Sequence, residues 1–300
     1  GEKEWLAGYA EENLSAPVLA LLGLDGKLHD YNSMLSAIAL LPKGNIGADD
    51  VAALRDMLTW PNDQFPEGMR EIEINSIKND VLERLLRQKV LPEAMGYQLV
   101  DMFADTESDP VWKNYCVQYM SPLYERLTTE YTEYTEGEGS VAQASRLPSD
   151  GLQDAGGTRE ELNAVRETML NALDAQEGAI AGTALIGVEL LSRTLEEFDR
   201  EKVVAKASKM ASDDSLPEGS RMTALRMSAL TGGDETTADT ARFLAQTGET
   251  MLMRSAALVT LGETGTAEDR ELLESFTFDD DRQIAAAAKL ALEKMDARGL

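Results

Sequence analysis

The chain has 300 residues but only one cysteine, Cys116, and one histidine, His29. A single cysteine excludes an intrachain disulfide, so the redox compartment stays open. One cysteine and one histidine cannot fill a structural zinc site, which takes four ligands, and they exclude the CxxCH motif that attaches haem. We expect no metal and no cofactor.

Aromatic residues and long apolar runs are also scarce. Aromatics make up 6% of the chain, and no run approaches the roughly 18 apolar residues that a membrane-spanning helix needs. Every tyrosine and tryptophan lies at or before Tyr134. We therefore expect no membrane insertion, and a second half that packs mainly through alanine, leucine and methionine.

Positive charge is in deficit. The chain carries 54 acidic and 28 basic residues, for a net charge of −26, and both halves share the excess. Phosphate backbones and anionic lipids repel such a surface, so nucleic acid and membranes are poor partners. A solvated acidic surface is the ordinary interpretation, and a basic or mixed-charge protein partner is compatible with it.

The compartment stays open. The chain begins with Gly1 and not with Met, which either a residue left over from cloning or the removal of a leader would explain. A soluble chain that was exported and lost its leader is one expectation.

Almost every segment has apolar residues at the i, i+3, i+4, i+7 spacing of an amphipathic helix, and sustained strand-type alternation is missing. We predict an all-α chain with helices near residues 28–41, 48–59, 67–88, 91–104, 109–127, 158–174, 177–194, 199–211, 217–230, 236–247, 250–261, 267–276 and 281–296.

Several of these predicted helices begin at residues that favour capping. Thr158–Glu161 and Ser215–Glu218 have the form of a capping box, in which a hydroxyl and a carboxylate satisfy free amide groups reciprocally. Thr236 and Thr266 resemble simpler caps.

The helical pattern lapses between residues 129 and 157, where glycine, serine, proline and charged residues dominate. We predict a loop or hinge there. It divides the chain into an N-terminal helical block, residues 1–128, and a C-terminal block, residues 158–300.

Three stretches of the second block repeat a pattern. Arg221, Arg254 and Arg282 are each followed, three and four positions later, by two small or apolar residues. Similarity at intervals of about thirty residues is typical of stacked helical hairpins. Small side chains at these positions allow two neighbouring helices to approach closely.

The stretch Met253–Gly262, MRSAALVTLG, resembles the second helix of a bacterial HEAT-type repeat, V-R-x-x-A-A-x-A-L-G. Asp109–Lys113, DPVWK, resembles the entry to the same helix, with Cys116 at a small position. The resemblance is strongest over residues 220–296 and fair over 91–120. It implies a right-handed α-solenoid, an α-α superhelix of about 12–14 helices related to armadillo-like folds.

Two segments depart from the repeat form, so the sequence defines the repeat class but not the exact register of the repeat units. Residues 177–194 have the small residues without the basic one, and Lys289 stands where leucine is expected.

The run Asp279–Asp281 precedes the last predicted helix. Calcium loops place oxygen ligands at alternating positions around a glycine, and this run does not. We therefore interpret these aspartates as helix caps at the positive end of the helix dipole.

No residue of the chain is predicted to be catalytic. His29 has no nucleophile elbow beside it and is interpreted as an ordinary polar surface residue. Cys116 is interpreted as buried packing, because no strong base neighbours it. Trp112, Tyr115 and Tyr119 share one side of their helix; this stripe is a candidate partner-binding surface if exposed, although core packing is its more common role.

The resemblance implies a non-enzymatic scaffold that binds a protein or peptide, because HEAT-type arrays chiefly serve protein binding. Two alternatives stay open. One is an enzyme or cofactor-handling protein, since some HEAT-like families act as lyases on tetrapyrroles. The other is a structural spacer within a larger polypeptide.

Overall fold

The structure, a computed structural model, describes residues 12–139, 159–233 and 235–300. Within these ranges it contains fourteen α-helices and no strand. The all-α prediction is therefore confirmed, and the number of helices agrees with it. No helix in these ranges is long and apolar enough to cross a membrane.

The chain divides into two compact units. Unit 1 comprises Gly1–Cys116 and Arg126–Val165, and unit 2 comprises Val117–Glu125 and Arg166–Leu300. The helices of unit 1 are α2 (Ala16–Leu21), α3 (Tyr31–Leu40), α4 (Ala48–Leu58), the 3-10 turn η1 (Asn62–Gln64), α5 (Glu71–Leu86) and α6 (Met95–Ala104). Helices α7 (Pro110–Gly139) and α8 (Arg159–Ala172) contribute residues to both units. The remaining helices of unit 2 are α9 (Ile180–Ser192), α10 (Arg200–Ala211), α11 (Glu218–Leu230), α12 (Glu235–Thr247), α13 (Met251–Thr264), the 3-10 turn η3 (Ala267–Asp269), α14 (Arg270–Phe276) and α15 (Arg282–Ala297).

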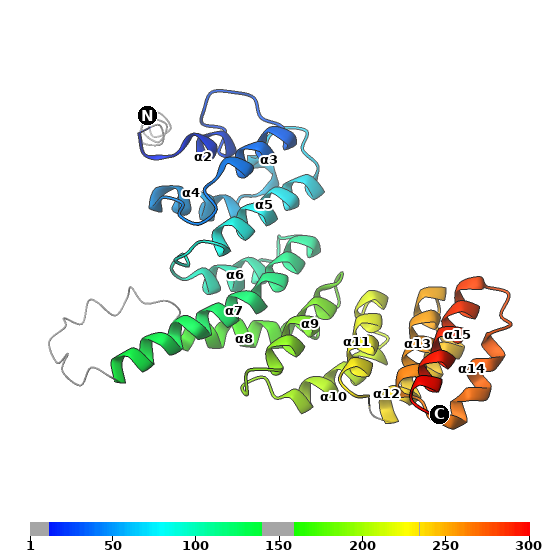
Figure 1. Cartoon of the computed structure of the whole chain (residues 1–300). Coiled ribbons are helices and arrows are strands. Elements are labelled where there is room, and N and C mark those ends of the chain that lie inside the picture. The colour runs from blue at the N-terminus through cyan, green and yellow to red at the C-terminus, as the bar shows by residue number, and fades with distance from the viewer. Residues whose placement is uncertain (1–11, 140–158, 234) are drawn as a thin grey trace. The chain divides into compact units, whose positions relative to one another are not determined.

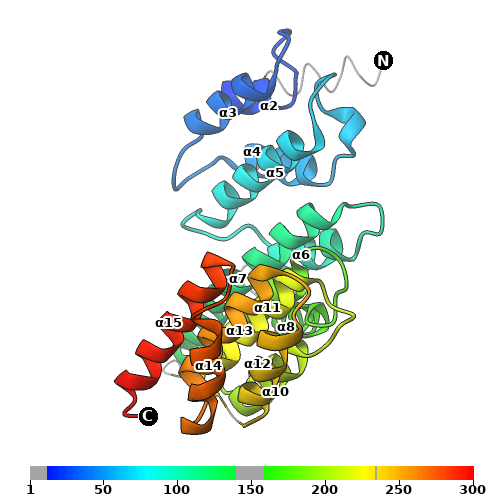
Figure 2. The ribbon, with the colours of Figure 1, turned by 90° about the vertical axis from the view of Figure 1, so that its right-hand side faces the viewer.

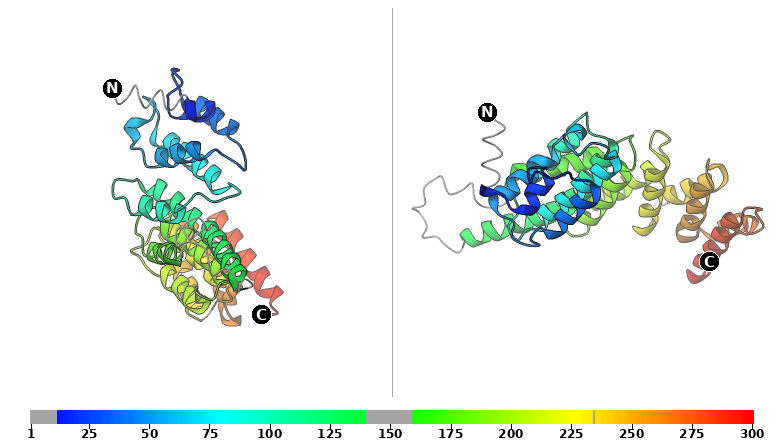
Figure 3. Two further views of the ribbon diagram at one scale, coloured as in Figure 1. Left: turned by 90° about the vertical axis from the view of Figure 1, so that its left-hand side faces the viewer. Right: turned by 90° about the horizontal axis from the view of Figure 1, so that it is seen from above.

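Unit 2 is a stack of helical hairpins. The pairs α10–α11, α12–α13 and α14–α15 pack within themselves, and α9, α11, α13 and α15 each pack against the next in that series. The hairpins follow one another in chain order, from yellow-green to red, in Figure 1 and in the right-hand view of Figure 3. This succession is the solenoid arrangement that the repeat predicts.

Small residues line the contact between α13 and α15. A Cβ atom added to Gly262 would lie 2.5 Å from the Cα atom of Ala291. Ala257 and Ala288 are fully buried on these two helices. The helices therefore meet nearly backbone to backbone, as the small residues of the repeat predict.

Two of the three repeated arginines have the same structural role. The Nε atom of Arg221 donates to the carbonyl oxygen of Ala211 (3.3 Å), and that of Arg254 donates to the carbonyl oxygen of Ala245 (3.2 Å). Each carbonyl belongs to the last turn of the preceding helix, whose final carbonyl groups have no intrahelical donor. Arg282 is instead exposed at the start of α15, so the third unit differs from the other two.

Unit 1 is also built from helical pairs. Helix α2 packs against α3, α4 against α5, and α3 against α5, in the order seen in Figure 2. The core of α5 is aliphatic, with Ile77, Val81 and Leu82 fully buried. This core fixes α5, which carries three residues of the candidate site, Glu71, Asn75 and Lys78.

Two elements differ from the sequence prediction. Helix α2 was not predicted, because its six residues are too few to display a helical period. Helix α7 continues to Gly139, so residues 129–139 of the predicted loop are helical. Residues 128–136 contain neither glycine nor proline, so nothing there ends the helix. Residues 140–157 of that loop lie outside the described residues.

Two of the four predicted hydroxyl caps, at Ser215 and Thr236, are wrong. Helix α11 begins after Pro217, which makes no side-chain cap, and Ser215 donates instead to Asp213. Thr236 lies inside α12. Thr158 lies outside the described residues. Thr266 does cap the following turn, through a capping box with Asp269.

Candidate functional site

A hollow of about 960 Å³ opens on unit 1. Its volume lies at the upper end of the range for ligand pockets, roughly 300–1,000 Å³. Helices α4, α5 and α6, the turn after α4 and the segment that leads into α7 form its walls. The lining residues are Ala52, Arg55, Asp56, Leu58, Thr59, Trp60, Pro61, Asn62, Glu71, Asn75, Lys78, Ala94, Tyr97, Gln98, Asp101, Met102, Asp105, Glu107, Ser108, Asp109 and Trp112.

Negative charge dominates this hollow, since Arg55 and Lys78 are the only basic side chains among the described residues that line it. Its six carboxylates come from four separate segments of unit 1: Asp56, Glu71, Asp101, Asp105, Glu107 and Asp109. Like charges gathered on a concave surface focus the electrostatic potential there. The hollow therefore attracts cations more strongly than a convex surface with the same number of charges.

Four of the six carboxylates have hydrogen-bond partners. Glu71 accepts from the side-chain amide of Asn62 (3.4 Å). Asp109 accepts from the amide of Asn75 on α5 (3.0 and 3.1 Å) and from the backbone N–H of Val111 (2.8 Å), at the start of α7. Asp56 accepts from the indole N–H of Trp60 (3.0 Å). Asp105 accepts from the hydroxyl of Ser108 (2.8 Å).

The pKa of Asp105 lies below its ordinary value. The largest cause is the hydrogen bond from the backbone N–H of Glu107, and the Ser108 hydroxyl adds to it. Asp105 is therefore ionised at neutral pH.

Two further carboxylates are free to bind a ligand. Among the described residues, the side chains of Asp101 and Glu107 have no hydrogen bond or salt bridge, and both are exposed. Tyr97, 37% exposed, lies on the same helix as Asp101 and lines the same hollow. An exposed ring beside free carboxylates suits a ligand that has an apolar stem and a cationic end.

The basic residue Arg55 is already engaged. Its Nε atom donates to Oε1 of Gln98 (2.7 Å), and the Gln98 amide donates back to the carbonyl oxygen of Arg55 (2.8 Å). This pair joins α4 to α6 across the hollow, and it reduces the repulsion that Arg55 would offer to a cationic ligand.

Lys78 places a buried ammonium at the hollow. Lys78 is 7% exposed. Nζ donates to the carbonyl oxygen of Trp60 (2.5 Å) and lies 5.5 Å from the ring centres of Phe65 and Trp112. Burial lowers the pKa of Lys78, and the charge of Asp109 opposes that effect.

The aromatic stripe proposed from the sequence does not form an exposed surface. Trp112 is 2% exposed and packs beside Lys78, while Tyr115 and Tyr119 are half-buried and do not line the hollow. Trp112 is buried with its ring beside the ammonium of Lys78 on α5. Of the three predicted binding residues, the hollow therefore includes only Trp112, as a buried part of its wall.

The remaining chemical candidates are Cys116 and His29. Cys116 is fully buried, as predicted, and burial raises the pKa of its thiol well above the ordinary value. His29 differs from the prediction of a surface residue, since its side chain is 9% exposed and Nε2 lies 2.7 Å from Oδ1 of Asp25. The hydrogen bond from His29 lowers the pKa of Asp25.

Asp281 caps α15. Its Oδ1 atom accepts from the backbone N–H groups of Gln283 (2.7 Å) and Ile284 (3.3 Å). The described ranges contain no cluster of histidine, cysteine and acidic residues suited to a metal ion. The interpretation of the aspartate run as a cap is therefore confirmed at Asp281.

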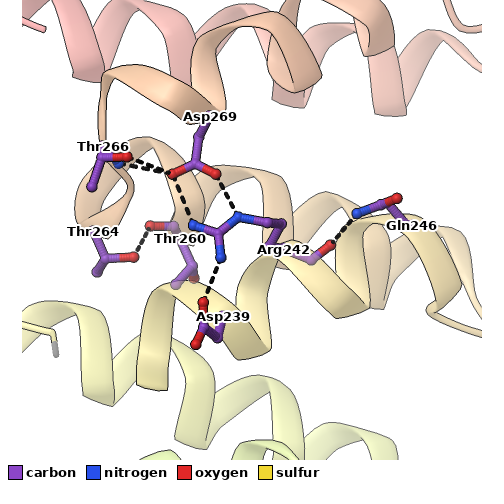
Figure 4. Close-up of polar contacts among 7 residues, drawn as sticks. All are labelled: Asp239, Arg242, Gln246, Thr260, Thr264, Thr266 and Asp269. Atoms are coloured by element: carbon purple, nitrogen blue, oxygen red, sulfur yellow. Dashed lines mark hydrogen bonds and ion pairs between the residues drawn. The ribbon is translucent and has the colours of Figure 1, made fainter. Parts of the chain in front are cut away.

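A second polar cluster lies in unit 2 (Figure 4). Arg242 on α12 donates through two nitrogens to both oxygens of Asp269 (2.6 and 3.1 Å) and also pairs with Asp239. Asp269 is 3% exposed and accepts in addition from the backbone N–H of Thr266 (2.8 Å). Because its charges are paired within the cluster, we interpret it as an ion-pair network that joins α12 to η3 and not as a binding site.

Comparison with known proteins adds little to this description. No protein-family profile matches the chain, and no curated protein matches it. Among solved structures, the chain is similar to human deoxyhypusine hydroxylase, determined in complex with glycerol, with 12% identity and a TM-score of 0.35. The similarity covers 98% of this chain and 99% of that one. A likeness this weak carries no argument about fold or function.

Proposed function

We propose that this chain is a HEAT-type repeat module that binds a protein partner without catalysing a reaction, and that the hollow of unit 1 receives a basic segment of that partner. The observation that carries the proposal is the excess of carboxylates around a concave site with an exposed aromatic ring. The sequence resemblance to HEAT-type repeats favours protein binding as the role.

The charges favour a basic peptide over other ligands. Among the described residues, no salt bridge neutralises Asp101 or Glu107, so an arginine or lysine of a partner gains their full attraction. Each exposed ion pair contributes about 0.2–1 kcal/mol. Two such pairs change the dissociation constant by roughly 2- to 30-fold.

The binding assay is a calorimetric titration with a short arginine-containing peptide in low salt. The double variant Asp101→Asn/Glu107→Gln should bind the peptide about 2- to 30-fold more weakly than the wild type. Its matched control is Glu67→Gln/Glu93→Gln, which removes the same charge from exposed positions of unit 1 outside the hollow.

Two results support the proposal and two overturn it. Binding should weaken as salt is added, because a Debye length of about 8 Å at physiological ionic strength screens exposed charges, and the control should bind like the wild type. Equal losses in both double variants would show only a general charge effect. Absence of saturable binding by the wild type would also reject the proposal.

A further inference from the structure

The buried ammonium of Lys78 lacks an anionic partner. An ammonium carries three N–H donors. Among the described residues, Lys78 forms a single hydrogen bond, to the carbonyl oxygen of Trp60. Asp109 acts on Lys78 through its charge, but its oxygens already accept from Asn75 and from the start of α7. The described residues include no salt bridge to Lys78.

The neighbouring aromatic rings do not replace an anionic partner for Lys78. The faces of Phe65 and Trp112 attract the cation, yet at 5.5 Å from their centres they supply no oxygen acceptor. A buried charge is stable when it is both paired and hydrogen-bonded. A ligand carboxylate in the hollow would complete the surroundings of Lys78.

The hollow therefore offers two recognition features of opposite sign. Lys78 is a single, largely buried positive charge, whereas Asp101 and Glu107 are solvent-exposed negative charges. An anion must reach Lys78 end-on, because Lys78 is only 7% exposed. The end of a polypeptide presents its carboxylate with no chain beyond it.

We propose that the hollow binds the C-terminal residue of a partner polypeptide, an arginine or lysine, with the terminal carboxylate on Lys78 and the basic side chain on Asp101 and Glu107. The inference rests on the proposed function and names the part of the partner that is recognised. Recognition of the chain end uses both features, which distinguishes this ligand from an internal basic segment, which uses the carboxylates alone.

The test compares a short glycine- and serine-containing peptide that ends in arginine with the same peptide as its C-terminal amide. A charge-assisted hydrogen bond adds about 10- to 100-fold to affinity, so the free acid should bind the wild type at least 10-fold more tightly than the amide. Lys78→Met should abolish this preference while both peptides still bind through the carboxylates. Lys43→Met, which changes an exposed lysine of unit 1 outside the hollow, should keep it.

Equal binding of the acid and the amide to the wild type overturns the inference but leaves the proposed function standing, and this comparison needs no variant to fold. A preference that persists in Lys78→Met also overturns it. An amidated peptide with an internal glutamate that binds as tightly as the free acid refutes recognition of a chain end. Failure of both peptides to bind rejects the proposed function itself.

Discussion

Gly262 allows α13 and α15 to approach closely, so its replacement by alanine tests the packing of unit 2. The added Cβ atom would lie 2.5 Å from the Cα atom, 2.6 Å from the carbonyl oxygen and 2.8 Å from the Cβ atom of Ala291. Two of these atoms belong to the backbone, so a change of rotamer cannot relieve the overlap. The two helices must move apart.

The magnitude follows from two opposing effects. Overpacking of a tight core contact costs about 1–3 kcal/mol, while replacement of a helical glycine by alanine gains up to about 1 kcal/mol of helix propensity. Because backbone atoms are involved, we expect the cost at the upper part of its range. Gly262→Ala should therefore destabilise unit 2 by about 1–2 kcal/mol.

The matched control is Gly219→Ala. Gly219 is also a helical glycine of unit 2, but an added Cβ atom there meets no atom within 4 Å. With the propensity gain and no overlap, this variant should be unchanged or stabilised by up to about 1 kcal/mol.

Urea unfolding, followed by circular dichroism, measures both variants. Tryptophan fluorescence reports unit 1 in the same samples, because Trp60 and Trp112 belong to that unit and unit 2 has no tryptophan. The dichroism midpoint attributable to unit 2 should fall for Gly262→Ala alone, at an unchanged slope. A Gly262→Ala protein as stable as the wild type would refute close packing at this seam.

Three further predictions concern single side chains. Asp281→Ala should destabilise unit 2 by about 1 kcal/mol in urea unfolding, because two N–H groups of α15 lose their acceptor, whereas Asp280→Ala, at an exposed position, should have little effect; equal effects would contradict the capping role. Arg242→Met should cost about 2–3 kcal/mol, somewhat less than breaking a fully buried pair, because the guanidinium is 36% exposed while Asp269 is 3% exposed. Burial raises the pKa of Asp269, but the hydrogen bonds from Arg242 and Thr266 outweigh it and hold that pKa below its ordinary value. The stabilisation by the ion pair is therefore complete above about pH 4 and is lost as the pH falls through the folded pKa. The wild type and Arg242→Met should thus become equally stable in acid, and a difference in unfolding free energy that stays constant with pH would contradict the ion pair. Cys116 should react with a thiol reagent only as fast as its surroundings open, since burial raises its pKa; rapid labelling of the native protein, compared with the urea-unfolded chain, would contradict its burial.

Much of the helical architecture could be predicted from the sequence, because apolar residues recur with the period of a helix and unit 2 repeats its own pattern. The prediction of a close seam rested on the small or apolar residues that follow each repeated arginine, such as Ala257, which is fully buried on α13. The close approach of α13 and α15 agrees with that prediction, but its tightest contact, between Gly262 and Ala291, lies at other positions. Caps were less predictable. A hydroxyl three residues before a carboxylate is compatible with a capping box, but at Ser215 the neighbouring Asp213 accepts the hydroxyl instead.

The candidate site could not be predicted in the same way. Its carboxylates come from segments as far apart as Asp56 and Asp109, and no local period brings them together. The acidic run Asp101–Asp109 was visible but does not differ in composition from a solvated surface. Lys78 gave no signal, since a lysine on a helix is ordinarily exposed; its burial depends on Trp112 and on the carbonyl oxygen of Trp60.

The most direct test of the proposed binding site is an NMR titration of protein labelled with ¹⁵N in its tryptophan indoles, using the peptide that ends in arginine. The indole N–H of Trp60 lines the hollow and donates to Asp56, so its signal should move saturably, with the dissociation constant measured by calorimetry. The Asp101→Asn/Glu107→Gln protein should require more peptide to reach the same shift. A Trp60 signal that stays in place while the peptide binds would contradict the assignment of the hollow as the binding site.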